Sequence, residues 1–173
     1  MESNDNKPSK SLVSKPQILT PDLTTSYKLP IFINPVKAGF PSPATDYEEV
    51  KLDLNTHLIA HPNATFFVHI DGDSMIDAKI QSGDIAIVDR SLEARNGDVI
   101  LAVIDGDFTI KRLEIRDNKG ETLKDKTKLT VATQNTKQIR LLPENPKFEP
   151  IEITGNMIFQ VWGVVTSVIH KMR

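Results

Sequence analysis

The stretch "DIAIVDRSLEARNGDVILAVIDGDFTIKRLEI", residues 84–115, contains three short apolar runs separated by turn residues. The runs are rich in Ile and Val, which favour strands, and each is shorter than an ordinary helix. Asn96-Gly97 and Asp105-Gly106 stand between runs, and such pairs adopt the positive φ angles that tight hairpins require. The stretch therefore predicts a group of antiparallel strands.

The same pattern extends outward over most of the chain after residue 64. The further β-type runs are "TFFVHI" (65–70), "KLTVAT" (128–133), "QIRLLP" (138–143), "IEIT" (151–154) and "IFQVWGVVTSVI" (158–169). A chain of 173 residues has room for one core of ordinary size. We therefore expect a mostly β fold with one compact antiparallel β domain.

Two segments depart from this pattern. Residues 41–62 carry apolar side chains near helical spacing between Tyr47 and Leu58, which predicts a short helix that ends before Pro62. Residues 116–137 are strongly hydrophilic and predict a long, solvated hairpin extension.

The first 38 residues contain five of the eleven prolines and show no apolar periodicity before "KLPIFINPV". Such a segment cannot bury enough surface to offset its ordering entropy, so residues 1–38 are expected to form an extended, mobile arm. Pro30 and Pro35 favour extended geometry in the residues before them, and "LPIFINPVKAGF" (29–40) can therefore lie as a strand against another segment.

Composition excludes several classes of protein. The chain has no cysteine, which excludes disulfides, thiolate catalysis and zinc sites that use sulfur. Its formal net charge of -2 gives no general attraction to phosphate backbones or anionic membranes. The N-terminus is polar, and the 13-residue apolar run at 157–169 is shorter than the roughly 20 residues of a membrane-spanning helix. These features predict a cytoplasmic protein without a membrane segment.

Ser74, in "GDSM" (72–75), is open to two interpretations. Gly, Asp and Ser are the residues that turns select, so the serine is explained by turn formation alone. It also follows a predicted strand, where a nucleophile could be presented. Two familiar serine motifs are absent: Ile76 replaces the second glycine of a hydrolase elbow, and Asp77 stands where Ser-x-x-Lys requires lysine.

A serine nucleophile needs a base, and the chain offers histidines and a lysine. The histidines are His57, His61, His69 and His170, none of which lies in a catalytic motif. His57 and His61 have the i, i+4 spacing of helical metal ligands, but no third ligand accompanies them, so no metal site is expected.

Lys111 lies in the strand-like run "FTIKRLEI" (108–115), on the face opposite Phe108 and Ile110. A lysine between apolar neighbours is ordinarily a surface residue with a partly covered stem. Use as a base would require its pKa to fall by about three units, which costs about 4 kcal/mol and is within reach of burial.

The combination of "GDSM" with the downstream "FTIKRL" (108–113) resembles the LexA/UmuD family of self-cleaving Ser/Lys proteases, and most closely its UmuD-type members. The resemblance also includes "RLLPENPKFEPIEI" (140–153) and "VWGVVTSVIHKMR" (161–173), and it covers most of residues 38–173. It implies a β-clip type of C-terminal domain behind an N-terminal arm.

The resemblance also implies the site. Ser74 would be the nucleophile, Lys111 the general base, and the backbone N–H groups of Ser74 and Met75 the oxyanion donors. The substrate would be the chain's own Ala38-Gly39 bond in "VKAGFPSP". Cleavage there would divide the chain into the arm, residues 1–38, and the peptidase-like domain, residues 39–173. No cofactor is implied.

Partners follow from the same resemblance. A RecA–single-stranded DNA filament would stimulate cleavage, and the processed homodimer would join a UmuC-like Y-family polymerase in translesion synthesis during the bacterial SOS response. Only 38 proline-broken residues precede Gly39, which is too short for the helix-turn-helix domain of a LexA-type repressor. Specific DNA binding is therefore not expected.

Three alternatives remain from the sequence alone. The chain could be a non-catalytic, β-rich polymerase adaptor, a LexA-like repressor fragment, or a signal-peptidase-like enzyme, although no membrane anchor supports the last. The long arm and residues 116–137 depart from the shorter segments of familiar UmuD proteins, which leaves the activator contact open.

Overall fold

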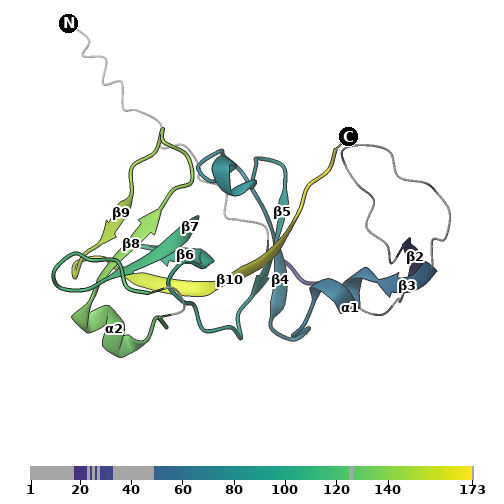
Figure 1. Ribbon diagram of the computed structural model, residues 1–173, viewed down its shortest axis with the longest axis horizontal. Helices are drawn as coiled ribbons and strands as arrows, with labels where there is room; N and C mark the ends of the chain where they lie inside the picture. The colour runs from purple at the N-terminus through teal and green to yellow at the C-terminus, as the bar shows by residue number, and fades with distance from the viewer. Residues whose placement is uncertain are drawn as a thin grey trace, which may run out of the picture.

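The computed structural model describes residues 18–22, 24, 26, 28–32, 49–124 and 127–172. Within these residues, strands form an eight-stranded sheet with the order β1-β4-β5-β10-β6-β7-β8-β9 and a two-stranded sheet of β2 and β3 (Figure 1). All the strand pairs are antiparallel. The expected mostly β, antiparallel fold is confirmed.

The strand bounds follow the apolar runs closely. The larger sheet contains β1 (Ile18–Leu19), β4 (Thr65–His69), β5 (Ile85–Asp89), β6 (Val99–Ile104), β7 (Asp107–Arg116), β8 (Gln138–Leu142), β9 (Ile151–Ile153) and β10 (Phe159–Ile169). The smaller sheet contains β2 (Lys28–Phe32) and β3 (Glu49–Asp53).

Alternating side chains of the large sheet pack into two buried clusters. Ile100, Ala102, Leu113 and Ile115 belong to the larger cluster, whereas Leu101 from the same strand as Ile100 belongs to the other. Successive residues of a strand point to opposite faces, so β6 contributes to both clusters. The sheet is thus buried on both faces at its centre.

Strand β10 bends so that it can pair with both β5 and β6. Its register shifts between Val165 and Ser167 against β5 and between Val161 and Gly163 against β6. A Cβ atom at Gly163 would lie 2.6 Å from Cγ1 of Val88 and 2.9 Å from the carbonyl oxygen of Asp89. Only glycine permits this approach of the two backbones.

The region of the expected helix at 41–62 is only partly helical. Residues Glu49–Asp53 form β3, which pairs with β2 along its whole length, and α1 covers only Leu54–Leu58. The Asp53 side chain accepts hydrogen bonds from two N–H groups of the first helical turn, which fixes where the helix begins. The strand expected at 29–40 is confirmed within residues 29–32, while residues 33–40 lie outside the described residues.

The strand predicted at 128–133 is wrong, and the solvated hairpin predicted at 116–137 is confirmed only at its start, where Arg116 and Thr122 form an antiparallel bridge. Residues Val131–Thr136 form α2, which begins at a capping box made by Thr130 and Thr133. Leu123 and Leu129 pack against the larger buried cluster, so these two side chains attach an otherwise largely exposed segment to the core.

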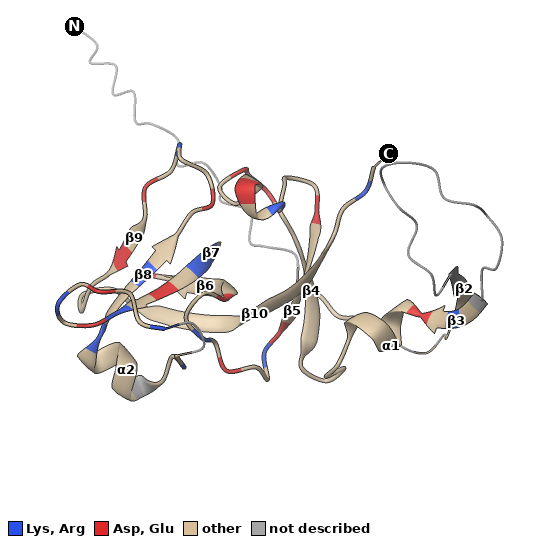
Figure 2. Cartoon of the chain, in the orientation of Figure 1, with Lys and Arg blue, Asp and Glu red and all other residues tan. Residues whose placement is uncertain are grey.

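Charged residues of both signs are scattered over the described strands and loops (Figure 2). Among the described residues, no helix is long and apolar enough to cross a membrane.

Candidate active site

The segment that presents Ser74 is the loop between β4 and β5, residues 70–84, called here the serine loop. Its two ends are held together, because the Ile70 N–H donates to the Asp84 carbonyl at 2.9 Å and the Gly83 N–H donates to the Ile70 carbonyl at 2.9 Å. Gly72 and Gly83 both have positive φ, which the tight turns of this loop require. The loop also contains the 3-10 turn η1 (Ile76–Ala78).

The buried carboxyl of Asp84 closes the base of the loop. Its Oδ2 accepts the Gln81 N–H at 2.8 Å, and its Oδ1 lies 2.5 Å from His170 Nδ1. Burial raises the pKa of Asp84, but the bonds from Gln81 and His170 outweigh it and hold the pKa below its ordinary value. The ionised carboxylate therefore stabilises the loop.

The structure brings Ser74 and Lys111 together from distant parts of the sheet. Lys111 lies in the middle of β7, opposite Ile100 of β6, and its Nζ is 2.8 Å from Ser74 Oγ. The order β4-β5-β10-β6-β7 places two strands between β5, which follows the serine loop, and β7. The contact therefore depends on the fold and not on proximity in sequence.

The Lys111 amine is enclosed. Only 8% of the residue's surface is exposed, and Nζ also lies 2.9 Å from the Ile110 carbonyl and 3.1 Å from Thr109 Oγ1. Burial lowers the pKa of Lys111 below its ordinary value of 10.5, because desolvation disfavours the ammonium form. This is the direction that a general base requires.

The backbone beside the serine offers donors. Among the described residues, the N–H groups of Ser74 and Met75 donate no hydrogen bond. The Ser74 carbonyl accepts the Glu144 N–H, and the Met75 carbonyl accepts N–H groups of Ala78 and Ile80 in the same loop. Met75 is only 3% exposed, so its side chain is buried.

The histidines take other positions. His61 Nδ1 lies 2.6 Å from Asp89 Oδ2, and His170 pairs with Asp84 as described above. Among the described residues, neither His57 nor His69 contacts the Ser74 hydroxyl. No group of three or more His, Asp or Glu side chains suited to a metal occurs within the described ranges.

The Ala38-Gly39 bond and the boundary between residues 1–38 and 39–173 lie outside the described residues. Both stay predictions.

Sequence reasoning missed one neighbour of the serine loop, the segment 143–150 between β8 and β9. Glu144 and Asn145 of this segment hydrogen-bond to the loop, across 72 residues in the case of Asn145 and Asp73. An open surface pocket of about 310 Å³ lies on this segment, lined by residues that include Pro143, Pro146 and Phe148 and, from the serine loop, by Asp77. The three prolines and the short polar run of 143–150 read as an ordinary loop, so only the folded structure reveals the contact.

A β domain that sets a serine hydroxyl against a buried lysine amine has the arrangement of a serine peptidase of the Ser/Lys class. Comparison with known proteins agrees with this class. The model of the Peptidase S24-like family matches residues 30–128.

Three relatives match most of the chain. Protein ImpA of Escherichia coli is 40% identical over 148 residues, which cover 86% of this chain and 88% of the relative. Protein SamA of Salmonella typhimurium is 40% identical over 147 residues, covering 83% and 86%. Protein MucA of Escherichia coli is 36% identical over 141 residues, covering 81% and 83%.

The chain therefore belongs to the Peptidase S24-like family. This finding confirms the predicted LexA/UmuD membership and makes the chain a UmuD-type SOS mutagenesis protein.

Proposed function

We propose that the protein cleaves its own Ala38-Gly39 bond, with Ser74 as the nucleophile and Lys111 as the general base. The single observation that carries the proposal is the 2.8 Å contact between Lys111 Nζ and Ser74 Oγ at an enclosed amine. Membership of a peptidase family supports the same chemistry.

The surroundings of Lys111 suit a neutral amine. A neutral amine has two N–H donors and one lone pair. The Ile110 carbonyl and Thr109 Oγ1 can accept the two donors at 2.9 and 3.1 Å, which leaves the lone pair for the Ser74 hydroxyl. Lys111 then takes the Ser74 proton as Oγ attacks the Ala38 carbonyl carbon.

The tetrahedral intermediate carries its negative charge on the former carbonyl oxygen. The N–H groups of Ser74 and Met75 are the proposed donors to that oxygen, since neither is used elsewhere among the described residues. The C–N bond then breaks, Lys111 passes its proton to the amine of Gly39, and water hydrolyses the resulting ester at Ser74.

The substrate is tethered on both sides. Strand β2 ends at Phe32 before the proposed bond, and β3 begins at Glu49 after it, and the two strands pair with each other. A tethered bond has a high effective concentration at the site, so a modestly activated serine suffices for one turnover.

In its cellular role, the proposed protein is cytoplasmic and bacterial, and a RecA–single-stranded DNA filament stimulates its cleavage. The processed form, residues 39–173, acts as a homodimer with a UmuC-like Y-family polymerase in translesion synthesis. The UmuD-type relatives support this role.

Two substitutions test the chemistry. Ser74→Ala removes the nucleophile and Lys111→Ala removes the base, and each is expected to abolish self-cleavage of the purified chain at about pH 9–10 while the circular dichroism spectrum stays that of the wild type. Gel electrophoresis over time measures the intact fraction.

Appreciable cleavage of Lys111→Ala under these alkaline conditions would exclude lysine from the mechanism. A wild-type chain that stays whole under these conditions would favour the non-catalytic adaptor.

A further inference from the structure

The serine loop is bonded to the segment 143–150 at three points. The Glu144 N–H donates to the Ser74 carbonyl at 2.9 Å, and the Asp77 N–H donates to the Glu144 carbonyl at 2.8 Å. The third bond comes from a side chain, because Asn145 Nδ2 donates to the Asp73 carbonyl at 2.9 Å. These bonds hold the residue before Ser74, Ser74 itself and the turn after it.

The Asn145 side chain uses both ends of its amide. Its Oδ1 accepts the Lys147 N–H at 3.0 Å, which forms a turn within its own segment, and its Nδ2 reaches across to the serine loop. Asn145 is 7% exposed, so the amide is shielded from water. If the amide nitrogen and oxygen were exchanged, Nδ2 would face the Lys147 N–H, donor against donor, and Oδ1 would face the Asp73 carbonyl, acceptor against acceptor. Only the observed orientation of the amide therefore satisfies both partners.

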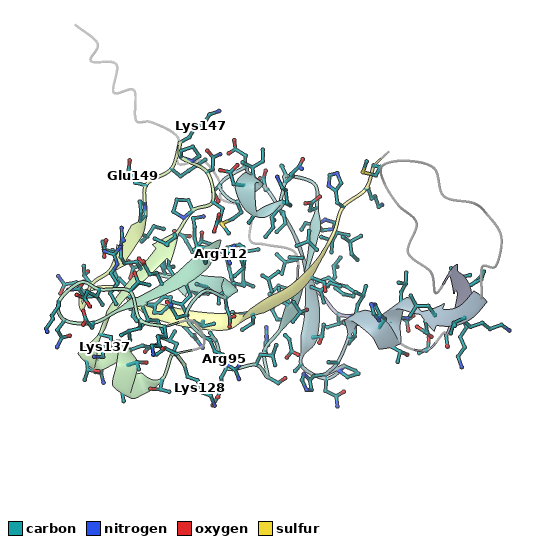
Figure 3. All side chains as sticks on the ribbon, viewed as in Figure 1. Arg95, Arg112, Lys128, Lys137, Lys147 and Glu149 are labelled. Atoms are coloured by element: carbon teal, nitrogen blue, oxygen red, sulfur yellow. The ribbon has the colours of Figure 1, made fainter. Side chains whose placement is uncertain are left out.

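The segment 143–150 belongs to the part of the sheet that carries Lys111. It follows β8 directly, and β8 pairs with β7 with Leu142 opposite Arg112, the residue after Lys111. Arg112 also forms an ion pair with Glu144, and its Nη1 donates to the Gly97 carbonyl at 2.7 Å. Figure 3 shows Arg112 on β7, below the loop that carries Lys147 and Glu149.

The serine loop, in contrast, belongs to β4 and β5, which are separated from β7 by β10 and β6. Figure 1 shows the coil of the serine loop beside the loop that joins β8 to β9. The bonds from Glu144 and Asn145 therefore connect the element that carries the serine to the elements that carry the lysine.

We propose that Asn145 is a positioning residue for Ser74, which sets the distance between Ser74 Oγ and Lys111 Nζ by holding the Asp73 carbonyl. This inference rests on the proposed self-cleavage. Asn145 itself touches neither of the two reacting groups. A displacement of about 1 Å at a reacting atom lowers rates by about a hundredfold, so the loss of this bond should be visible in the rate.

Two substitutions at Asn145 separate its functions. Asn145→Asp keeps the acceptor for the Lys147 N–H and removes the donor to Asp73, so the turn persists without the bridge. Asn145→Ala removes both without adding a charge, which leaves the charge around Lys111 unchanged. Asn96→Ala is the matched control, because Asn96 is a buried asparagine that bonds to Leu123 and Ile115 and not to the serine loop.

The experiment measures the first-order rate of self-cleavage of the full chain from about pH 8 to 10.5, at a temperature where thermal melting shows every variant to be folded. We expect both Asn145 variants to lower the limiting rate at high pH about tenfold or more. The midpoint of the pH profile of Asn145→Ala should stay at the wild-type value, because Lys111 stays buried. Asn96→Ala should lower the melting temperature but keep the wild-type rate.

A wild-type rate in folded Asn145→Asp and Asn145→Ala would overturn the positioning role. An equal loss of rate in folded Asn96→Ala would also overturn the positioning role, because general loosening of the domain would then explain the slower cleavage of the Asn145 and the Asn96 variants alike. Failure of the proposed function looks different: the wild type would stay whole, or Ser74→Ala would be cleaved as fast as the wild type.

Discussion

Lys111 is buried, and its amine has three hydrogen-bond partners among the described residues, all of them oxygens. The Ser74 hydroxyl, the Ile110 carbonyl and Thr109 Oγ1 lie within 2.8–3.1 Å of its Nζ. All three can accept a hydrogen bond, but only the two hydroxyls can donate one. When the amine loses one proton, the Ser74 hydroxyl can therefore change from accepting a hydrogen bond to donating one, and no heavy atom has to move.

The pH dependence of cleavage follows from the lysine. Burial lowers the pKa of Lys111 below 10.5, and only the neutral amine can take a proton. The cleavage rate should therefore rise with pH and level off once the amine is neutral, with a midpoint below 10.5. Rates of fragment formation across a pH series measure this profile, and a rate that falls over the same range would contradict the assignment.

At the scale of elements, hydrophobic runs predicted most strands of the large sheet, because each run buries side chains in a cluster. The run "KLTVAT" (128–133) was wrongly predicted as a strand, because its threonines also suit the start of a helix. Thr130 and Thr133 form a capping box, and these local hydrogen bonds outweigh the β preference of Val131 and its neighbours. The pairing of strands that are distant in sequence has no local sequence pattern, and so it could not be predicted. The same is true of the hydrogen bond from Asn145 to Asp73.

The candidate site was only partly within reach of sequence reasoning. Ser74 could be explained as a turn residue and Lys111 as a surface lysine, so neither residue by itself indicated a catalytic role. Only the resemblance to a known family paired them as nucleophile and base. The burial that lowers the pKa of Lys111 is a property of the folded sheet.

The bend of β10 depends on one glycine. Gly163→Ala would place a methyl group against the Val88 side chain and the Asp89 backbone. The backbone cannot move away without breaking the pairing of β10 with β5, so we expect a loss of about 1–3 kcal/mol in the free energy of unfolding. Urea denaturation measures it. Gly155→Ala is the control, since a Cβ there meets nothing within 4 Å, and equal stability of the two variants would contradict this account.

At the scale of the whole molecule, the described residues of the proposed arm lie outside both buried clusters. Neither buried cluster contains a residue before Phe66, and the described part of the arm contributes only β1, at the edge beside β4, and β2, beside β3.

A chain of residues 39–173 should therefore fold alone. Its urea denaturation midpoint is expected to lie close to that of full-length Ser74→Ala, because both buried clusters are retained. A fragment that shows no cooperative unfolding would mean that the arm is part of the domain.

Self-cleavage is tested most directly by following the mass of the purified full chain over time at about pH 10, at two protein concentrations tenfold apart. Two fragments, residues 1–38 and residues 39–173, are expected to appear with one first-order rate at both concentrations. A chain that stays intact, or one cut at a bond other than Ala38-Gly39, would rule out the proposed reaction.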